Sequence, residues 1–256
     1  MLFRRLILSA VLVGALVGAL LGLGEQFSTA PLIAAAEHQA EGHGHAHGHE
    51  HEHSAEAGHG HHGDGTAWAP ADGAQRIGFT IVTNMGVAIG FSLLLMVAMY
   101  IAARGRGAPV NAATGAAWGL AGFAVVFVAP SLGLPPEVPG AASAGLTERQ
   151  LWWLFTAAVT AAALAIAVFA PGWRKLPALV LLPLPYLFGA PEMPASPYGG
   201  HDAATAAALE TIHGQFVWAA GLTNAVFWLV LGVACGWAMQ RWVLDRDVIG
   251  GAHAAG

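Results

Sequence analysis

Long apolar stretches alternate with short polar ones along most of this chain. Five stretches fall within or above the roughly 17–25 residues that a helix needs to cross a bilayer, namely 6–23, 77–103, 112–134, 151–170 and 215–239. A sixth apolar stretch, 176–190, is shorter and is interrupted by Pro177, Pro183 and Pro185. The pattern therefore predicts an all-α polytopic membrane protein with a bundle of six transmembrane helices, or five if the proline-broken stretch does not cross.

The distribution of positive charge favours six crossings over five. Lys and Arg concentrate in the cytoplasmic loops of membrane proteins. If the N-terminus is inside, six crossings leave only Arg76 and Arg149 outside, because the other basic residues fall inside: Arg4, Arg5, Arg104, Arg106, Arg174, Lys175, Arg241 and Arg246. With five crossings, Arg241 and Arg246 would lie outside. We therefore expect both termini in the cytoplasm, with the segment from about residue 25 to residue 76 outside a bacterial inner membrane.

The outer face is also the acidic face on this topology. Thirteen of the fifteen Asp and Glu residues fall outside, all except Asp245 and Asp247. Aromatic residues that anchor helices at the two membrane interfaces are expected to be Trp152 and Trp153 outside and Trp173 and Trp242 inside. The periplasmic or extracellular side should therefore attract cations.

The topology divides the chain into four parts. Residues 1–36 form the first transmembrane helix and its flank, 37–76 a His-rich loop, 77–242 the transmembrane bundle and 243–256 a cytoplasmic tail. The N-terminal arginines, the apolar run and the alanines at 34–36 also resemble a cleavable signal peptide. Small residues four apart favour a retained, closely packed helix instead; they occur as Gly14/Gly18/Gly22, and also as Gly86/Gly90, Gly115/Gly119 and Gly232/Gly236.

Composition excludes several classes of function. The chain is 56% apolar and 10% charged, with a mean hydropathy of +0.58, whereas soluble domains are about 25% charged. The single cysteine, Cys235, excludes an intramolecular disulfide and any CxxC site. The single lysine, Lys175, lies in no phosphate-binding loop motif. Basic residues are too scattered for nucleic-acid binding, and no catalytic motif is complete, so we expect neither an enzyme nor an organic cofactor.

The predicted outer loop is exceptionally rich in histidine. Residues 38–62 hold ten of the thirteen histidines, including the alternating set His43, His45, His47, His49, His51 and His53, followed by His59, His61 and His62. Neutral imidazole is a common ligand for Co²⁺, Ni²⁺ and Zn²⁺. Low hydrophobicity predicts a segment that is disordered without metal. The pattern therefore predicts metal binding without fixing the metal; the alternative is a solvated linker that binds metal incidentally.

A second group of candidate ligands lies on the last predicted helix and just before it. Glu210 precedes His213 by three residues, the spacing of Glu-x-x-His metal ligands, and His201 lies in the same outer segment. Asn224 and Cys235 follow at steps of eleven residues, almost three helical turns, which predicts a path inward along one stripe. The alternative is that Asn224 bonds a neighbouring helix, Cys235 packs and His213 lies at a wet interface.

Two other stretches carry residues of interest. Ser92, Met96 and Met99 share one face of the second predicted helix, where packing is a commoner role for methionine than ligation of copper(I). The proline-broken stretch carries Tyr186 and Glu192 beside its break. Discontinuous helices bind substrate in many transporters, and the alternative here is a short kinked packing helix.

Several segments together resemble the CbtA family of predicted cobalt transporter subunits. They are AWAPADGAQR (67–76), AAWGLAGFAVVFVAPSLGLPPEVPG (116–140), ERQLWW (148–153), LPLPYLFGAP (182–191) and NAVFWLVLG (224–232). The resemblance implies a bacterial inner-membrane protein with a His-rich outer segment, a single-span His-containing CbtB partner and a link to cobalamin synthesis. Tyr186 stands where the family often has histidine. Glu137 and the pair Arg149–Gln150 become candidates for shaping the outer mouth, with Glu137 expected to pair with Arg149.

These observations predict a membrane transport protein whose substrate is a divalent transition metal. Cobalt uptake for cobalamin synthesis is favoured, with metal capture by the His-rich loop. Nickel or zinc transport, efflux, and a membrane-anchored metal-binding accessory module that does not transport are the alternatives. The expected partners are membrane lipid, a CbtB-type subunit and a second copy of the chain. The sequence leaves the direction, the energy source and the metal open.

Overall fold

The computed structural model describes residues 2–41, 70–71, 73–192 and 194–244, and in these ranges it contains helices and no strand. The α-helices are α1 (Leu2–Glu25), α2 (Ala30–Glu41), α3 (Ala74–Arg106), α4 (Ala112–Phe123), α5 (Ala129–Ser131), α6 (Leu146–Phe169), α7 (Pro177–Leu181), α8 (Leu184–Phe188) and α9 (Ala203–Ala238). Other helical turns are η1 (Ala124–Val128), η2 (Gly172–Lys175) and η3 (Met239–Leu244). The predicted all-α class is confirmed.

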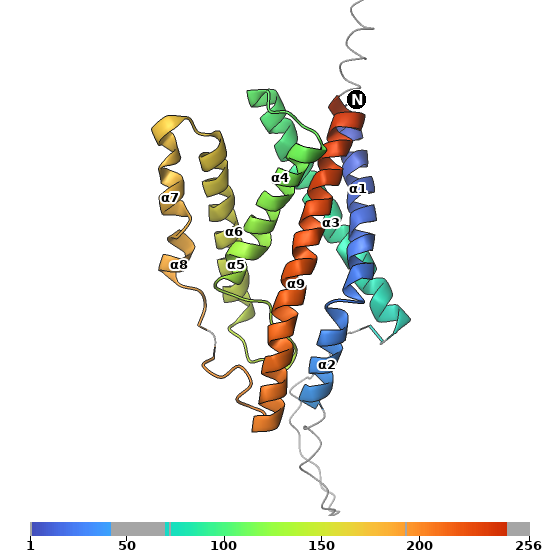
Figure 1. Ribbon diagram of the computed structural model, residues 1–256, viewed down its shortest axis with the longest axis vertical. Helices are drawn as coiled ribbons and strands as arrows, with labels where there is room; N and C mark the ends of the chain where they lie inside the picture. Colours follow the sequence, from blue (N-terminus) through green and yellow to red (C-terminus); the bar gives the residue numbers. More distant parts are fainter. Residues whose placement is uncertain (1, 42–69, 72, 193, 245–256) are drawn as a thin grey trace, which may run out of the picture.

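Five helical stretches of the described chain are long and apolar enough to cross a membrane. They are Leu2–Glu25, Ala74–Arg106, Ala112–Ser131, Leu146–Phe169 and Ala203–Leu244, and each contains or closely overlaps one of the five long predicted stretches. The sixth stretch forms α7 and α8, which pack on α6 and bring the chain part of the way back along the bundle, and a non-helical segment continues from α8 toward the start of α9 (Figure 1). The end of α9 lies beside the beginning of α1 (Figure 1).

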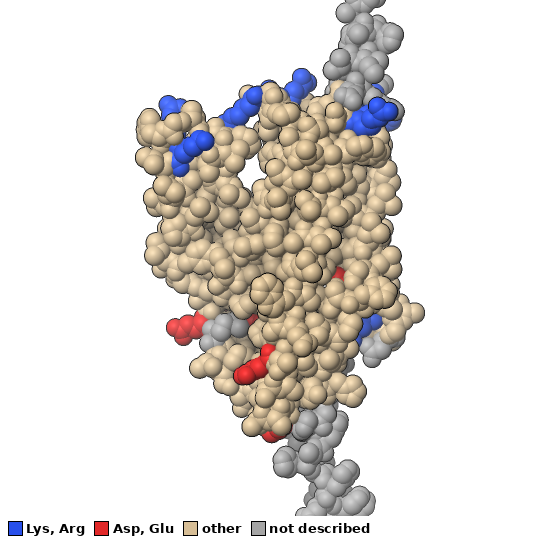
Figure 2. Space-filling model, viewed as in Figure 1, with Lys and Arg blue, Asp and Glu red and all other residues tan. Residues whose placement is uncertain are grey.

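Charge is segregated to the two ends of the bundle. Figure 2 shows Lys and Arg gathered at the end where α1 begins and α9 ends, and Asp and Glu toward the other. We call these the arginine-rich end and the acidic end. The predicted inner set of basic residues lies at the arginine-rich end, except that Arg246 is outside the described residues, as are Asp245 and Asp247. An apolar core about 30 Å thick tolerates charge only at its two surfaces.

Glycines hold two pairs of helices at backbone contact, as predicted for three of the four glycine sets. A methyl group on Gly14 or Gly18 would overlap the backbone of α3, and one on Gly22 would lie 2.9 Å from the Ile81 Cα. The pairs Gly115/Gly119 on α4 and Gly232/Gly236 on α9 face one another in the same way. Close backbone approach of this kind stabilises helix pairs in membranes through van der Waals contact.

The fourth glycine set was assigned wrongly. Gly86 and Gly90 have no atom within 4 Å of the position that a Cβ would take. Both lie on α3, whose contact with α1 runs through the neighbouring residues Ala88 and Ile89 instead. Spacing alone did not show which face of α3 meets a neighbour.

The innermost core lies between α1, α3 and α9. Met96, Met99, Leu231, Cys235 and Met239 are fully buried there. This confirms that the methionines of α3 pack in the core. It also places the only cysteine inside a closed contact between three helices.

Two expectations about the acidic end were wrong. Residues 30–41, expected in a loop, form the helix α2, which begins with Pro31 in its first turn and buries Ala36 against α9. Trp152 does not lie in an interfacial belt, because only 7% of it is exposed and its ring packs against Gly133 and Tyr186. Trp173, with 76% of its surface exposed, is placed as an anchor would be.

The glycine contact between α4 and α9 predicts a position-specific loss of stability. In Gly232→Ala the new methyl group would lie 2.6 Å from the Gly119 Cα, which should destabilise the protein by about 1–3 kcal/mol, as overpacking does. Gly86→Ala, the matched control, should be neutral or slightly stabilising because alanine favours helix. Thermal denaturation in detergent, followed by tryptophan fluorescence, measures both. Equal melting temperatures for the two variants would contradict the packing described here.

Candidate functional site

The acidic end is where the His-rich segment joins the bundle. His43, His45, His47, His49, His51, His53, His59, His61 and His62 lie outside the described residues. The segment that contains them leaves from the end of α2 and returns at the start of α3, and both points lie at the acidic end (Figure 1). The surface described next therefore lies where the described chain leaves for residues 42–69 and where it resumes.

A polar cavity of about 730 Å³ lies at the base of the His-rich segment, between α1, α2 and α3. We call it the root pocket. Its titratable lining residues are Glu25, Glu37, His38 and Arg76. Carboxylate and imidazole groups are ligands that divalent transition metals accept, so the pocket offers suitable ligand chemistry beside the points where the described chain leaves for the His-rich segment and returns from it. The sequence analysis had assigned no role to Glu25, Glu37 or His38.

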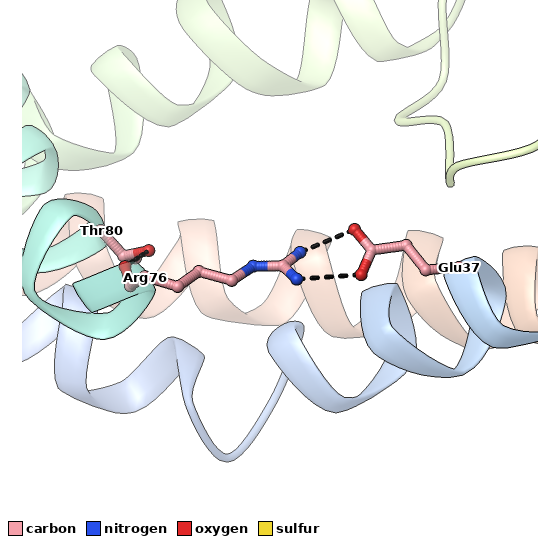
Figure 3. Close-up of polar contacts among 3 residues, drawn as sticks. All are labelled: Glu37, Arg76 and Thr80. Carbon is pink, nitrogen blue, oxygen red and sulfur yellow. Dashed lines mark hydrogen bonds and ion pairs between the residues drawn. The ribbon is translucent and has the colours of Figure 1, made fainter. Parts of the chain in front are cut away.

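The strongest ion pair of the root pocket joins α2 to α3. Arg76 donates from NH1 to Glu37 Oε2 at 2.9 Å and from NH2 to Oε1 at 2.7 Å, and Thr80 Oγ1 donates to the Arg76 carbonyl at 2.9 Å (Figure 3). Such a two-point contact fixes geometry as well as charge. It neutralises one of the two basic residues that lie outside the arginine-rich end. The sequence analysis did not find this pair because the partners are 39 positions apart along the chain.

Glu25 lies in the same pocket at the end of α1. Its Oε2 accepts a hydrogen bond of 2.5 Å from Asn84 Nδ2 on α3. Asn84 is also a neighbour of Gly22, whose close packing brings α1 and α3 together at this level. The glycine contact therefore positions a carboxylate between α1 and α3 on the side of the apolar core that faces the acidic end.

His201 and His213 both hold the loop that connects α5 to α6. His213 Nε2 lies 3.0 Å from the carbonyl oxygen of Pro136, and His201 Nε2 lies 3.3 Å from that of Gly140. A carbonyl only accepts, so Nε2 donates in both bonds, and Nδ1 carries the lone pair of each neutral ring. Gly140 has φ +89°, a conformation that glycine adopts readily and other residues rarely. Each histidine thus keeps one nitrogen for another ligand.

The same loop carries Glu137, and its predicted pair with Arg149 in the first turns of α6 is confirmed. Arg149 NH2 lies 3.0 Å from Glu137 Oε2, and the Glu137 side chain is only 13% exposed. Its second oxygen, Oε1, is buried with no hydrogen-bond partner among the described residues, as is the Tyr198 hydroxyl. Two buried oxygens without partners make this part of the acidic end polar and incompletely satisfied.

Tyr198, which the sequence analysis did not single out, lies at the centre of this cluster. Its ring meets that of His213 edge-on, with 6.2 Å between centroids. Burial raises the pKa of the Tyr198 hydroxyl, and the negative charges of Glu137 and Glu210 raise it further. Tyr198 therefore packs against His213 and is influenced by the charges of two carboxylates. The sequence signal that could have identified Tyr198 is an aromatic residue in a Pro- and Gly-rich segment close to His201.

The described residues form no ready-made metal centre. Within the described ranges, no group of three or more His, Cys, Asp or Glu side chains is placed to hold one ion. His201, Glu210 and His213 thus share a region without converging on a point. Asn224 donates to the Ala220 carbonyl of its own helix at 3.0 Å, rather than to a neighbouring helix. Cys235 is buried in the core between α1, α3 and α9.

Tyr186 also has a structural role. Its hydroxyl donates to the Ala129 carbonyl at 2.7 Å, and its ring lies edge-on to Trp152. The bond ties α8 to α5, just after the π-helical turn η1 and beside Pro130. The Tyr186 hydroxyl thus attaches the proline-broken stretch to α5, at the position where the family often has histidine.

Comparison with known families agrees with this picture of a membrane-spanning bundle. The model of the CbtA family, described as a probable cobalt transporter subunit, matches residues 3–240. The chain belongs to the CbtA family. A search of curated proteins and a search of solved structures each found no match. The CbtA family is a family of transporter subunits, which is not a class of enzyme. The word subunit in its description implies a partner chain.

The environment of Tyr198 predicts how its pKa responds to nearby charge. Glu137→Gln removes a negative charge that opposes the phenolate, so the pKa of Tyr198 should fall, and Glu210→Gln should lower it less. Absorbance titration of tyrosinate in detergent, corrected with Tyr198→Phe, measures the pKa. Glu148→Gln, in the exposed first turn of α6, serves as the control. A pKa that is the same in wild type and Glu137→Gln would contradict the cluster.

Proposed function

We propose that this CbtA-family chain takes up a divalent metal ion, with cobalt favoured, across the inner membrane of a bacterium. In this proposal the arginine-rich end faces the cytoplasm and the acidic end faces outward. The separation of basic and acidic residues along the bundle supports this orientation. The family's description supports cobalt as the substrate and transport as the process.

The observation that carries the proposal is the attachment of the His-rich segment to the root pocket. Nine histidines, from His43 to His62, would capture metal ions outside the cell. Because the segment leaves from α2 and returns to α3, captured metal stays within reach of Glu25 and His38. Ligand exchange between neighbouring imidazoles would then deliver it to the membrane surface.

The α9 cluster is the second receiving point in this proposal. His201, Glu210 and His213 would take the ion after small movements of their side chains, since each histidine ring keeps Nδ1 for a ligand. A site that is not fully formed binds weakly, and weak binding suits a step from which the ion must leave. Passage beyond it along Asn224 and Cys235 stays a prediction, and it requires α9 to separate from α1 and α3.

A partner and an energy source belong to the same proposal. A single-span, histidine-containing CbtB-type subunit is the expected partner, and the imported cobalt would serve cobalamin synthesis. The single lysine excludes a phosphate-binding loop motif. The membrane potential, an ion gradient or the partner would therefore supply the driving force, and no organic cofactor is needed.

One observation favours a second candidate function. The core around Cys235 is closed, as expected of a membrane-anchored metal-binding module that passes metal to a separate permease. Purified protein in liposomes distinguishes the two, because a transporter moves cobalt into the lumen and a binding module only holds it outside. The same assay with cobalt, nickel and zinc in competition identifies the metal.

Replacement of the histidines tests the capture step. With the nine histidines from His43 to His62 changed to asparagine, cobalt uptake at limiting concentration should fall, while uptake at saturating concentration stays near wild type. Wild-type uptake should likewise fall below about pH 6, because imidazolium has no lone pair for the metal. A control in which the glycines of the segment become serine should behave as wild type. Unchanged uptake at limiting cobalt would remove the segment from the mechanism.

Substitutions on α9 test the receiving step. Glu210→Gln and His213→Gln should each raise the cobalt concentration for half-maximal uptake, since each removes a ligand. Thr211→Ala is the matched control, because Thr211 only donates to the Ala207 carbonyl of its own helix. Initial rates of radioactive cobalt uptake in whole cells measure the effect. If the control and the ligand variants are alike, the α9 cluster has no part in transport.

A further inference from the structure

A second cavity lies in the arginine-rich half of the bundle, away from every candidate metal ligand. It has a volume of about 480 Å³ and lies between α3, the α4–η1 helix and α6, with Trp118, Phe169 and Trp228 among its walls. Its lining contains no charged side chain, and Thr114 supplies its only hydroxyl. The surface is visibly open here, between the α6–α8 part and the rest of the bundle (Figure 2).

The length and position of the cavity match one leaflet of a bilayer. Its walls run from Thr114 to Val126 along α4 and η1, roughly 18 Å at 1.5 Å per residue. One leaflet of hydrocarbon is about 15 Å thick, half of the roughly 30 Å core. Ala108 and Pro109 line the cavity at the arginine-rich end, so it extends from that interface to about the middle of the membrane.

A positive charge borders the interfacial end of this cavity. The Arg106 guanidinium carbon lies 4.7 Å from the centroid of the Phe169 ring, and Phe169 is a wall of the cavity that also meets Trp118. Arg104, two residues earlier on α3, stacks over Tyr100 and donates to its hydroxyl at 3.1 Å. The described carboxylates lie toward the other end of the bundle. The apolar slot thus opens beside a cationic group.

We propose that this cavity holds one acyl chain of an anionic phospholipid whose phosphate binds Arg106. A metal ion is excluded as occupant because the lining offers no suitable ligand set. A partner helix is too large, since a helix about 10 Å wide and 30 Å long fills roughly 2,400 Å³. A single chain of methylenes is narrow enough, and a phosphate complements the guanidinium. This inference does not depend on metal transport.

Quenching of tryptophan fluorescence by brominated lipid tests the proposal on the full chain. The protein is reconstituted in phosphatidylcholine that contains increasing fractions of phosphatidylglycerol or phosphatidylcholine with bromine on the acyl chains. The contribution of Trp118 is the difference between wild type and Trp118→Phe. Bromine quenches only at close range, so this difference reports a chain inside the cavity.

We expect brominated phosphatidylglycerol to half-quench Trp118 at an about fivefold lower fraction than brominated phosphatidylcholine, the preference that one arginine gives near an anionic lipid. Arg106→Gln should abolish the preference, and Arg174→Gln, at the same end but away from the cavity, should retain it. If Arg106→Gln does not fold, Ala165→Leu, which fills the cavity, should reduce quenching by both lipids.

Three results would overturn the proposal. Equal quenching by the two lipids in wild type would show that no anionic headgroup is selected. A preference that persists in Arg106→Gln would assign the selection to another group. Absence of Trp118 quenching by either lipid would show that protein, such as side chains of a partner helix, fills the cavity instead of an acyl chain.

Discussion

The cost of placing charge in hydrocarbon is the constraint on which the rest of this structure depends. It confines the described ionisable side chains to the two ends of an apolar bundle, with the basic ones mostly at one end and the acidic ones at the other. Since the interior must then be held together without charge, backbone contact at glycine supplies the packing between α1 and α3 and between α4 and α9. The proposed metal capture at the acidic end and the proposed lipid binding at the arginine-rich end both rest on this separation.

Two arginines lie at the acidic end instead of the arginine-rich end, and each is paired with a carboxylate there. Arg76 neutralises Glu37, and Arg149 neutralises Glu137. Each pair joins consecutive elements of the chain, α2 to α3 and the α5–α6 loop to α6. The remaining carboxylates and imidazoles, Glu25 and the α9 cluster among them, keep their capacity to attract cations.

Hydropathy predicted the membrane helices because the free energy of placing a helix in lipid depends on the summed hydrophobicity of about 20 residues. That sum can be calculated directly from the sequence. The close contacts of Gly14, Gly18 and Gly22 were predictable for a similar reason, since their spacing defines one face. The helix α2 was not predicted, because its alanines gain stability from α9 rather than from their own pattern. Neither the partner of Glu37 nor the position of Tyr198 could be predicted from the neighbouring sequence, because both depend on how segments distant in the sequence pack together.

Accessibility of single cysteines tests the orientation that the account requires. The only native cysteine is buried and is replaced by serine, after which Thr147→Cys marks the acidic end and Gly105→Cys the arginine-rich end. The account predicts that a membrane-impermeant maleimide labels Thr147→Cys on intact cells and Gly105→Cys only after lysis. The opposite pattern would place the His-rich segment in the cytoplasm and contradict metal capture from outside.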